Sequence, residues 1–134
     1  MEIKVKAWDK ISSQMVNVKV LDLFKGRVGL GWNEYDGITW RNIEDVELVQ
    51  YMGLKDKNGK EIYEGDIIKF YNQVEYITGY IAFDHGIFCL KIYNPDETCY
   101  NPWIFRAKEV EVIGNMFENF DLFNLCLKEA KDGD

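Results

Sequence analysis

The sequence is short of the residues from which most catalytic and metal sites are built. Its 134 residues include one histidine, three cysteines and two adjacent serines. A zinc site needs clustered His and Cys ligands, and a nucleophilic serine or cysteine needs a base beside it. The single histidine, His85, follows Asp84 in a predicted turn, where the metal signal is weak. We therefore expect no catalytic residue, no metal and no cofactor.

Cysteine pairs and long apolar runs are also missing. Cys89, Cys99 and Cys126 are far apart and odd in number, which fits neither a disulfide framework nor a zinc ribbon, so reduced cysteines are expected. No stretch reaches the roughly 20 apolar residues of a membrane span, and the first residues lack the apolar segment of a signal peptide. These absences predict a cytoplasmic protein with no membrane partner.

Positive charge is scarce, because 16 Lys and Arg residues stand against 23 Asp and Glu residues, for a net charge of −7. Binding to nucleic acid phosphates depends on clustered Lys and Arg. The acidic balance therefore favours a protein partner over a nucleic acid. A glycine-rich phosphate-binding loop ahead of a helix is also missing from the sequence.

Aromatic residues, in contrast, make up 15% of the chain. Packing of an irregular small core accounts for many of them. The others suit a protein interface, where Trp and Tyr side chains often dominate the binding energy. On a small β-barrel, exposed aromatics can instead stack against single-stranded bases. A nucleic-acid-binding module is therefore the alternative interpretation.

Alternating polar and apolar residues, interrupted by frequent glycines, predict short strands through most of the chain. The clearest are a hairpin formed by 3–8 and 15–20, and a central strand at 67–71 that is apolar on both faces. From Asn119 the apolar spacing becomes that of a helix, which we expect over about 119–131.

The fold class that follows is mainly β: a small barrel or a strongly bent antiparallel sheet of about eight short strands with one C-terminal helix. We treat 1–134 as a single domain. Within it, an N-terminal hairpin region covers about 1–50 and a barrel-like region about 51–118.

The segment from Gly53 to Asp66 gives the strongest local signal. Asn58-Gly59 readily takes positive φ at both positions, as a type I′ hairpin turn requires. Glu64-Gly65-Asp66 predicts a second tight turn, in which the Asp66 carboxylate can accept hydrogen bonds from the backbone of its own turn.

Three stretches resemble the YopX family of small proteins, found mainly in bacteriophages and prophages. They are Ile3-Lys-Val-Lys-Ala-Trp-Asp9, the run from Gln50 to Ile67 that contains Gly-Leu-Lys-Asp-Lys-Asn-Gly-Lys-Glu-Ile-Tyr-Glu-Gly-Asp, and Glu111-Val-Ile-Gly-Asn-Met-Phe-Glu-Asn119. The sequence departs from the family pattern in small ways: Met52 replaces a common threonine, Phe117 a frequent tyrosine and Phe120 a frequent proline.

The resemblance implies a mainly β fold, a phage or prophage origin and an accessory role in the bacterial host cell. It implies no activity, so no catalytic or binding residue is carried over. The residues of the family motifs are candidate sites, and we expect them to act in structure more than in function. They are Trp8, Asp9, Gly53, Leu54, Asp56, Gly59, Ile62, Tyr63, Glu64, Gly65, Asp66, Gly114 and Asn115.

The leading functional hypothesis is a non-enzymatic protein-binding module whose partner is a host or phage protein, with a homo-oligomer as one form of that contact. The alternative is a nucleic-acid-binding module that uses exposed aromatics. A third interpretation is an enzyme with carboxylate chemistry near Glu61, Glu64 and Asp66, but neighbouring lysines balance these acids and favour a solvated, salt-bridged turn.

Overall fold

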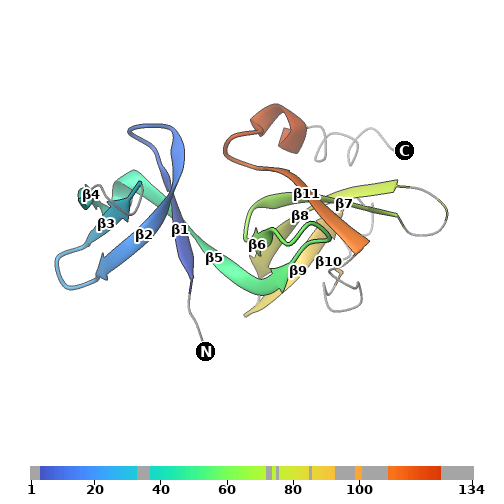
Figure 1. Ribbon diagram of the computed structural model, residues 1–134, viewed down its shortest axis with the longest axis horizontal. Coiled ribbons are helices and arrows are strands. Elements are labelled where there is room, and N and C mark those ends of the chain that lie inside the picture. The colour runs from blue at the N-terminus through green and yellow to red at the C-terminus, as the bar shows by residue number, and fades with distance from the viewer. Residues whose placement is uncertain are drawn as a thin grey trace. The chain divides into compact units, whose positions relative to one another are not determined.

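A computed structural model describes residues 4–32, 37–71, 74, 76–84, 86–92, 99–100 and 109–124. The chain is built mainly from antiparallel strands (Figure 1). It divides into two compact units, Met1–Tyr51 and Met52–Asp134, and each unit has its own hydrophobic core. The mainly β prediction is therefore confirmed.

Unit 1 is an antiparallel sheet that ends at an edge strand, β4. Its strands are β1 (Val5–Asp9), β2 (Gln14–Asp22), β3 (Arg27–Gly31), β4 (Thr39–Asn42) and the first half of β5 (Val46–Lys55), and the 3-10 helix η1 (Ile43–Asp45) joins the last two. They lie in the order β4-β3-β2-β1-β5. The predicted first hairpin is confirmed, because β1 pairs with β2 with Trp8 opposite Met15.

The core of unit 1 comes from the alternation of side chains along these strands. Residues two apart on a strand share a face, and the apolar ones on one face pack together. The buried cluster consists of Ala7, Val16, Val28, Leu30 and Val46. Val18, Trp32 and Leu48 are partly buried against it.

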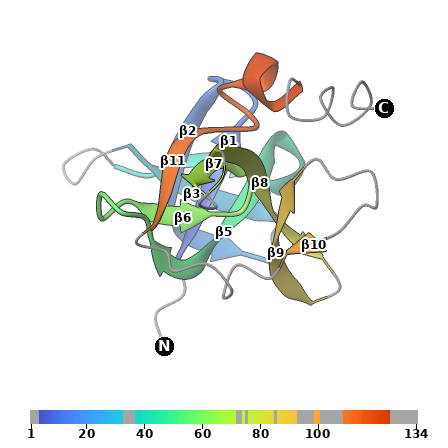
Figure 2. The same ribbon diagram turned by 90° about the vertical axis from the view of Figure 1, so that its right-hand side faces the viewer.

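Unit 2 begins within β5 and contains a second antiparallel sheet. Its strands are β6 (Glu61–Tyr63), β7 (Asp66–Tyr71), β8 (Tyr76–Asp84), β9 (Ile87–Ile92), β10 (Cys99–Tyr100) and β11 (Val110–Asn115). β6 lies next to β5, and the other five lie in the order β10-β9-β8-β7-β11, with β9 between β8 and β10 (Figure 2). Because β8 and β11 flank β7, the prediction of an inner strand at 67–71 is confirmed.

Side chains from most of these strands form the core of unit 2. The buried cluster consists of Met52, Ile62, Ile68, Phe70, Ile81, Leu90 and Val110. On the other face of the sheet, the ring of Phe123 meets Tyr80 edge-on, with 5.0 Å between the centroids. The helix therefore packs through an aromatic contact on the strand that pairs with Ile67.

The predicted number of strands and the barrel need adjustment. The described residues form eleven strands instead of about eight, because short pairings such as β6 and β10 leave no clear alternation in the sequence. Neither sheet closes on itself within the described residues, so the bent antiparallel sheet is the form that occurs. The helix begins at Phe120 and is described to Asn124, while the rest of the predicted 119–131 helix lies outside the described residues.

Two further sequence expectations have different outcomes. Cys89 is fully buried and disulfide-bonded, so the expectation of reduced cysteines is wrong for it; wide spacing in the sequence does not keep cysteines apart once strands pair. His85 lies outside the described residues. In the part of the chain that is described, no helix has both the length and the apolar character needed to cross a membrane.

Candidate functional site

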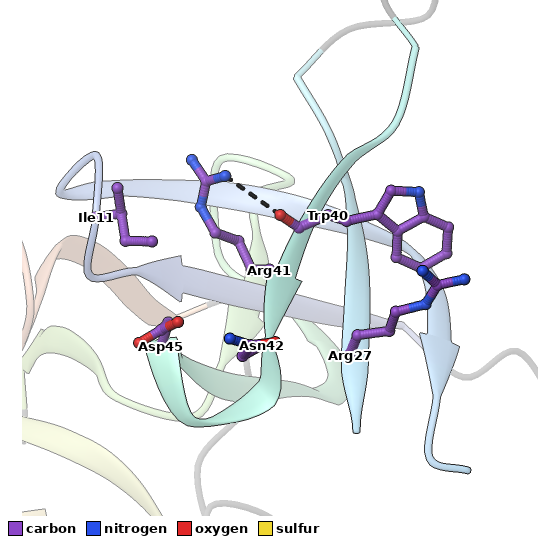
Figure 3. A pocket seen from close by; sticks show the side chains of 6 residues that line it. All are labelled: Ile11, Arg27, Trp40, Arg41, Asn42 and Asp45. Carbon is purple, nitrogen blue, oxygen red and sulfur yellow. Dashed lines mark hydrogen bonds between the residues drawn. The ribbon is translucent and has the colours of Figure 1, made fainter. Parts of the chain in front are cut away.

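A hollow of about 300 Å³ lies against the edge strand of unit 1 (Figure 3). This volume is at the lower end of the range for ligand pockets, so the hollow is suited to one or two side chains of a partner. The residues that line it are Ile11, Arg27, Trp40, Arg41, Asn42 and Asp45.

The position of the hollow follows from the strand that supplies half of its lining. Trp40, Arg41 and Asn42 are consecutive on β4, and consecutive side chains point to opposite faces of a sheet. A hollow that touches all three must therefore run along the edge of the strand. Among the described strands, β4 has β3 as its only neighbour, so this is the outer edge of the sheet.

On one face of β4, an arginine covers an indole ring. The guanidinium carbon of Arg27 lies 4.0 Å from the ring centroid of Trp40, a cation–π contact. Arg27 Nε lies 3.5 Å from Asp22 Oδ2, an ion-pair distance, yet Nε has no hydrogen-bond partner among the described residues. The Arg27 side chain is 38% exposed, so its charge faces the solvent at the hollow.

On the other face, the family-motif residue Asp9 holds Arg41 in place. Arg41 Nε donates to Asp9 Oδ1 at 3.1 Å, and Arg41 is only 20% exposed. Asp9 also accepts from Ser12 Oγ at 2.6 Å and from the Ile11 backbone N–H at 3.3 Å. Asp9 therefore positions two residues of the hollow, Ile11 and Arg41.

These contacts control the ionisation of the buried Asp9 carboxylate. Burial by itself raises the pKa of Asp9, but the hydrogen bonds from Ser12, Arg41 and the Ile11 amide, with the charge of Arg41, outweigh burial and hold the pKa below its usual value. Asp9 is therefore a fixed anion at neutral pH. A general base would need a pKa closer to 7, so Asp9 suits positioning and not proton transfer.

Exposed apolar side chains gather beside the hollow, over Gly29. A Cβ atom built on Gly29 would lie 2.6 Å from Ile38 Cγ2, 3.3 Å from Val20 Cβ and 3.4 Å from Trp40 Cζ3. All three side chains are exposed, Trp40 at 41%. At the adjoining β2–β3 turn, Phe24 is 98% exposed. Contiguous exposed apolar surface on a small protein is typical of an interaction site.

In unit 2, the motif residue Asp56 binds three backbone amides. Its Oδ1 accepts from the N–H groups of Asn58 at 2.8 Å and Lys60 at 2.9 Å, and its Oδ2 accepts from Val112 N–H at 2.9 Å. Burial alone raises the pKa of Asp56, but these bonds outweigh it and hold the pKa below its usual value.

The same contacts correct the predicted type I′ turn. Gly59 has φ of 80°, as a turn of this kind needs, but Asn58 does not have positive φ. The Asp56 carboxylate binds both the Asn58 and the Lys60 amides and so selects a different turn, which ends at Gly59.

The second predicted turn, at Gly65, is confirmed. Asp66 Oδ2 accepts from Tyr63 N–H at 2.8 Å, so this carboxylate does bind the backbone of its own turn. Gly65 has φ of 88°, its N–H donates to Ile81 C=O at 2.7 Å, and its C=O accepts from Met116 N–H at 2.9 Å. The turn therefore ties β8 and the residues after β11 together.

We expect Gly65→Ala to lower the free energy of unfolding by about 2–3 kcal/mol, because an L residue is strained at this φ. The added Cβ would also lie 3.2 Å from Met116 Sδ and from Phe117 Cε2. Gly53→Ala is the matched control, since Gly53 has φ of 92° with nothing within 4 Å of a Cβ. Urea unfolding should show the larger loss for Gly65→Ala; equal losses would mean that the contacts add nothing.

Asn115 and Gly114 prepare the start of the C-terminal helix. Asn115 Oδ1 accepts from the N–H groups of Phe117 at 3.0 Å and Glu118 at 2.8 Å, and the Asn115 N–H donates to Asn119 Oδ1 at 3.1 Å. A Cβ on Gly114 would lie 2.5 Å from that Asn119 oxygen. Glycine at 114 therefore leaves room for the contact that begins the helix.

The remaining motif residues contribute to packing and to backbone shape. Ile62 and Tyr63 are buried, while Trp8, Leu54 and Glu64 are partly buried. The described residues contain no group of three or more His, Cys, Asp or Glu side chains placed to hold a metal ion. Glu61, Glu64 and Asp66 therefore do not form such a group.

Apart from the motif residue Asp9, sequence reasoning did not find the hollow. Its lining is spread from Ile11 to Asp45, and only the sheet brings these residues together. One signal was available: Arg41 is the only basic residue in the acidic stretch 33–49. A lone arginine among carboxylates indicates a specific partner, which here is Asp9.

The fold and the hollow define a small, two-unit antiparallel β protein with a binding hollow at a sheet edge. The family model described as YopX protein matches residues 4–124, so the chain belongs to the YopX protein family.

Solved structures agree with this assignment. Protein EF1440 from Enterococcus faecalis is 26% identical, with a TM-score of 0.63 over 92% of this chain and 99% of that one. The protein yopX from Bacillus subtilis is 19% identical, with a TM-score of 0.59 over 89% of this chain and 96% of that one, and shows a similar fold. No curated protein sequence matches the chain.

Proposed function

We propose that the chain is a phage or prophage accessory protein that acts by binding another protein, without catalysing a reaction. The observation that supports this most directly is the exposed apolar surface beside the hollow of unit 1, formed by Val20, Ile38 and Trp40 with Phe24 at the adjoining turn. Removing such surface from water on binding is favourable, at roughly 25 cal/mol per Å².

The composition of this surface also suits a protein partner. Tryptophan and arginine are the residues most often found at the centre of protein interfaces, and here Arg27 lies over Trp40. The carboxylates Asp9 and Asp22 sit beside the two arginines, which makes the surface a poor site for a phosphate backbone.

The test is a crosslinking pull-down with the full chain from bacteria that carry the phage or prophage. We expect Phe24→Ser to reduce recovery of the partner by about tenfold or more, since exposed aromatic anchors dominate interfaces. Ile87→Ser is the matched control, because Ile87 is an exposed apolar residue at a turn of unit 2. A monomer in light scattering that recovers no partner would contradict the proposal.

One observation favours the alternative, a nucleic-acid-binding module. At the β7–β8 hairpin the exposed rings of Tyr71 and Tyr76 lie 5.1 Å apart, and Lys69 Nζ lies 4.5 Å from the Tyr76 centroid. Exposed rings beside a cation can stack against bases. Salt-dependent binding of an oligothymidine, lost in Tyr76→Ala and kept in Phe24→Ser, would replace the first proposal by this one.

A further inference from the structure

We infer that the outer edge of β4 binds an extended, acidic segment of the partner protein as an added strand. The inference rests on the proposed protein-binding function and names the surface and the chemistry of its partner. It is built from the hydrogen-bond pattern of β4, the charges on its two faces and the shape of the hollow along its edge.

The backbone of β4 has hydrogen-bonding groups that point away from β3. In an antiparallel pair, hydrogen-bonded and non-hydrogen-bonded residue pairs alternate. Ile43 N–H donates to Gly26 C=O at 2.9 Å, which makes Gly26 and Ile43 a hydrogen-bonded pair. The next pair, Arg27 with Asn42, is therefore non-hydrogen-bonded, and so is Gly29 with Trp40 two positions further on.

It follows that the N–H and C=O groups of Trp40 and Asn42 face the outer edge. The Trp40 carbonyl agrees with this direction, since it accepts from Arg41 Nη1 at 3.3 Å on that side (Figure 3). A strand laid antiparallel along this edge would pair with Trp40 and Asn42. Adding a strand to a free sheet edge is a common way to bind an extended peptide.

Charge selects the side chains of the added strand. Cross-strand neighbours share a face, so Arg27 is on the same face as Asn42 and Trp40, and partner residues paired with these two would point to that face as well. The nearby Asp22 makes no hydrogen bond to Arg27 Nε, and the guanidinium is partly exposed. A carboxylate on the partner can therefore bind Arg27, whereas a lysine would meet like charge.

The partner residue between these two would point to the other face. There it would meet Arg41, whose Nε is already bound to Asp9, and the exposed apolar side chain of Ile11. An apolar side chain suits this side of the hollow. The expected pattern is thus acidic, apolar, acidic in an extended segment, and the volume of the hollow fits its central side chains.

Asn42 allows the backbone contact to be tested by itself. Its φ of −69° and ψ of 144° are those of a proline, and its side chain makes no capping hydrogen bond to η1. Asn42→Pro removes the outward N–H without changing the backbone, and Asn42→Ala removes the side chain but keeps the N–H. The difference between the two variants measures the edge hydrogen bond.

The probe is a displayed library of random octapeptides, selected on the full-length protein. Enriched peptides are then synthesised with a fluorescein label, and binding is measured by anisotropy. We expect acidic, β-prone octapeptides that bind wild type and Asn42→Ala alike and Asn42→Pro at least about tenfold more weakly. Arg27→Gln should weaken them similarly and reduce their salt dependence, as should replacing their acids by lysine.

Several results would overturn the inference. These are no enriched octapeptide, enriched octapeptides without acids, or equal binding to Asn42→Pro and Asn42→Ala with both variants folded in urea unfolding. Self-association that is lost in Asn42→Pro would assign the edge to a second copy instead. If the pull-down still recovers a partner that depends on Phe24 but not on Asn42, the protein-binding function stands and the edge inference falls.

Discussion

Asp56→Ala is expected to lower the free energy of unfolding by about 3–5 kcal/mol, the largest loss we expect from a single substitution. The carboxylate accepts from three backbone amides, and a buried amide left without a partner costs about 1–3 kcal/mol. The Val112 amide belongs to β11, 56 residues further along the chain, so the loss would reach both the turn and the strand. Urea unfolding measures it.

The pH dependence gives a second reading of the same network. The folded pKa of Asp56 is lower than the unfolded value of 3.8, so its stabilisation is present above pH 3.8 and is lost as the pH falls below it. Wild type should therefore lose more stability between about pH 4 and pH 2 than Asp56→Asn does. The control is Glu109→Ala, an exposed carboxylate expected to change stability by less than about 0.5 kcal/mol. A loss no larger for Asp56→Ala would mean that water replaces the carboxylate.

Asp9→Ala is expected to have the second largest effect, a loss of about 2–4 kcal/mol. Removing one partner of a buried ion pair leaves the other charge without compensation. Here Arg41 keeps some solvent contact, which lowers the cost, while the fully buried Asp9 leaves a void and unpaired Ser12 and Ile11 donors. The loss should be accompanied by weaker partner binding, because Asp9 positions Ile11 and Arg41 in the hollow.

A double-mutant cycle separates the ion pair from the rest of the Asp9 network. With Arg41→Met, which keeps the length of the side chain but removes its charge, the coupling energy should be about 1–3 kcal/mol. Asp9→Ala should also flatten the fall in stability below pH 3.8, since the folded pKa of Asp9 is lowered as well. Additive losses in the cycle would show that Asp9 acts through Ser12 and Ile11 alone.

The local features of the fold could be predicted from the sequence because they depend on neighbouring residues. The turn at Gly65 follows from three consecutive residues, and the Asp66 carboxylate reaches an amide only three positions away. The inner strand at 67–71 follows from its apolar character on both faces. The turn at Asn58-Gly59 was predicted with the wrong geometry, because the Asp56 side chain competes for the amides that a type I′ turn leaves free.

The hollow could not be predicted, because it depends on strand register. Asp9 and Arg41 are 32 residues apart, and neither residue type indicates the other. The contact between Arg27 and Trp40 likewise requires that β3 and β4 pair with Gly29 opposite Trp40. A shift of one residue would turn these side chains to the other face. Composition indicated surplus aromatics, but only the pairing shows which of them gather over Gly29.

The division of the chain into two units has a consequence for the order of folding during synthesis. Every strand pair of unit 1 lies before Tyr51, so its sheet can form while β6 and the later strands are still being translated. Unit 2 must wait, because β7 pairs with β11 and Asp56 requires the Val112 amide. We expect the edge of β7 and the apolar side of its sheet to be the part of the nascent protein that is most open to misassembly.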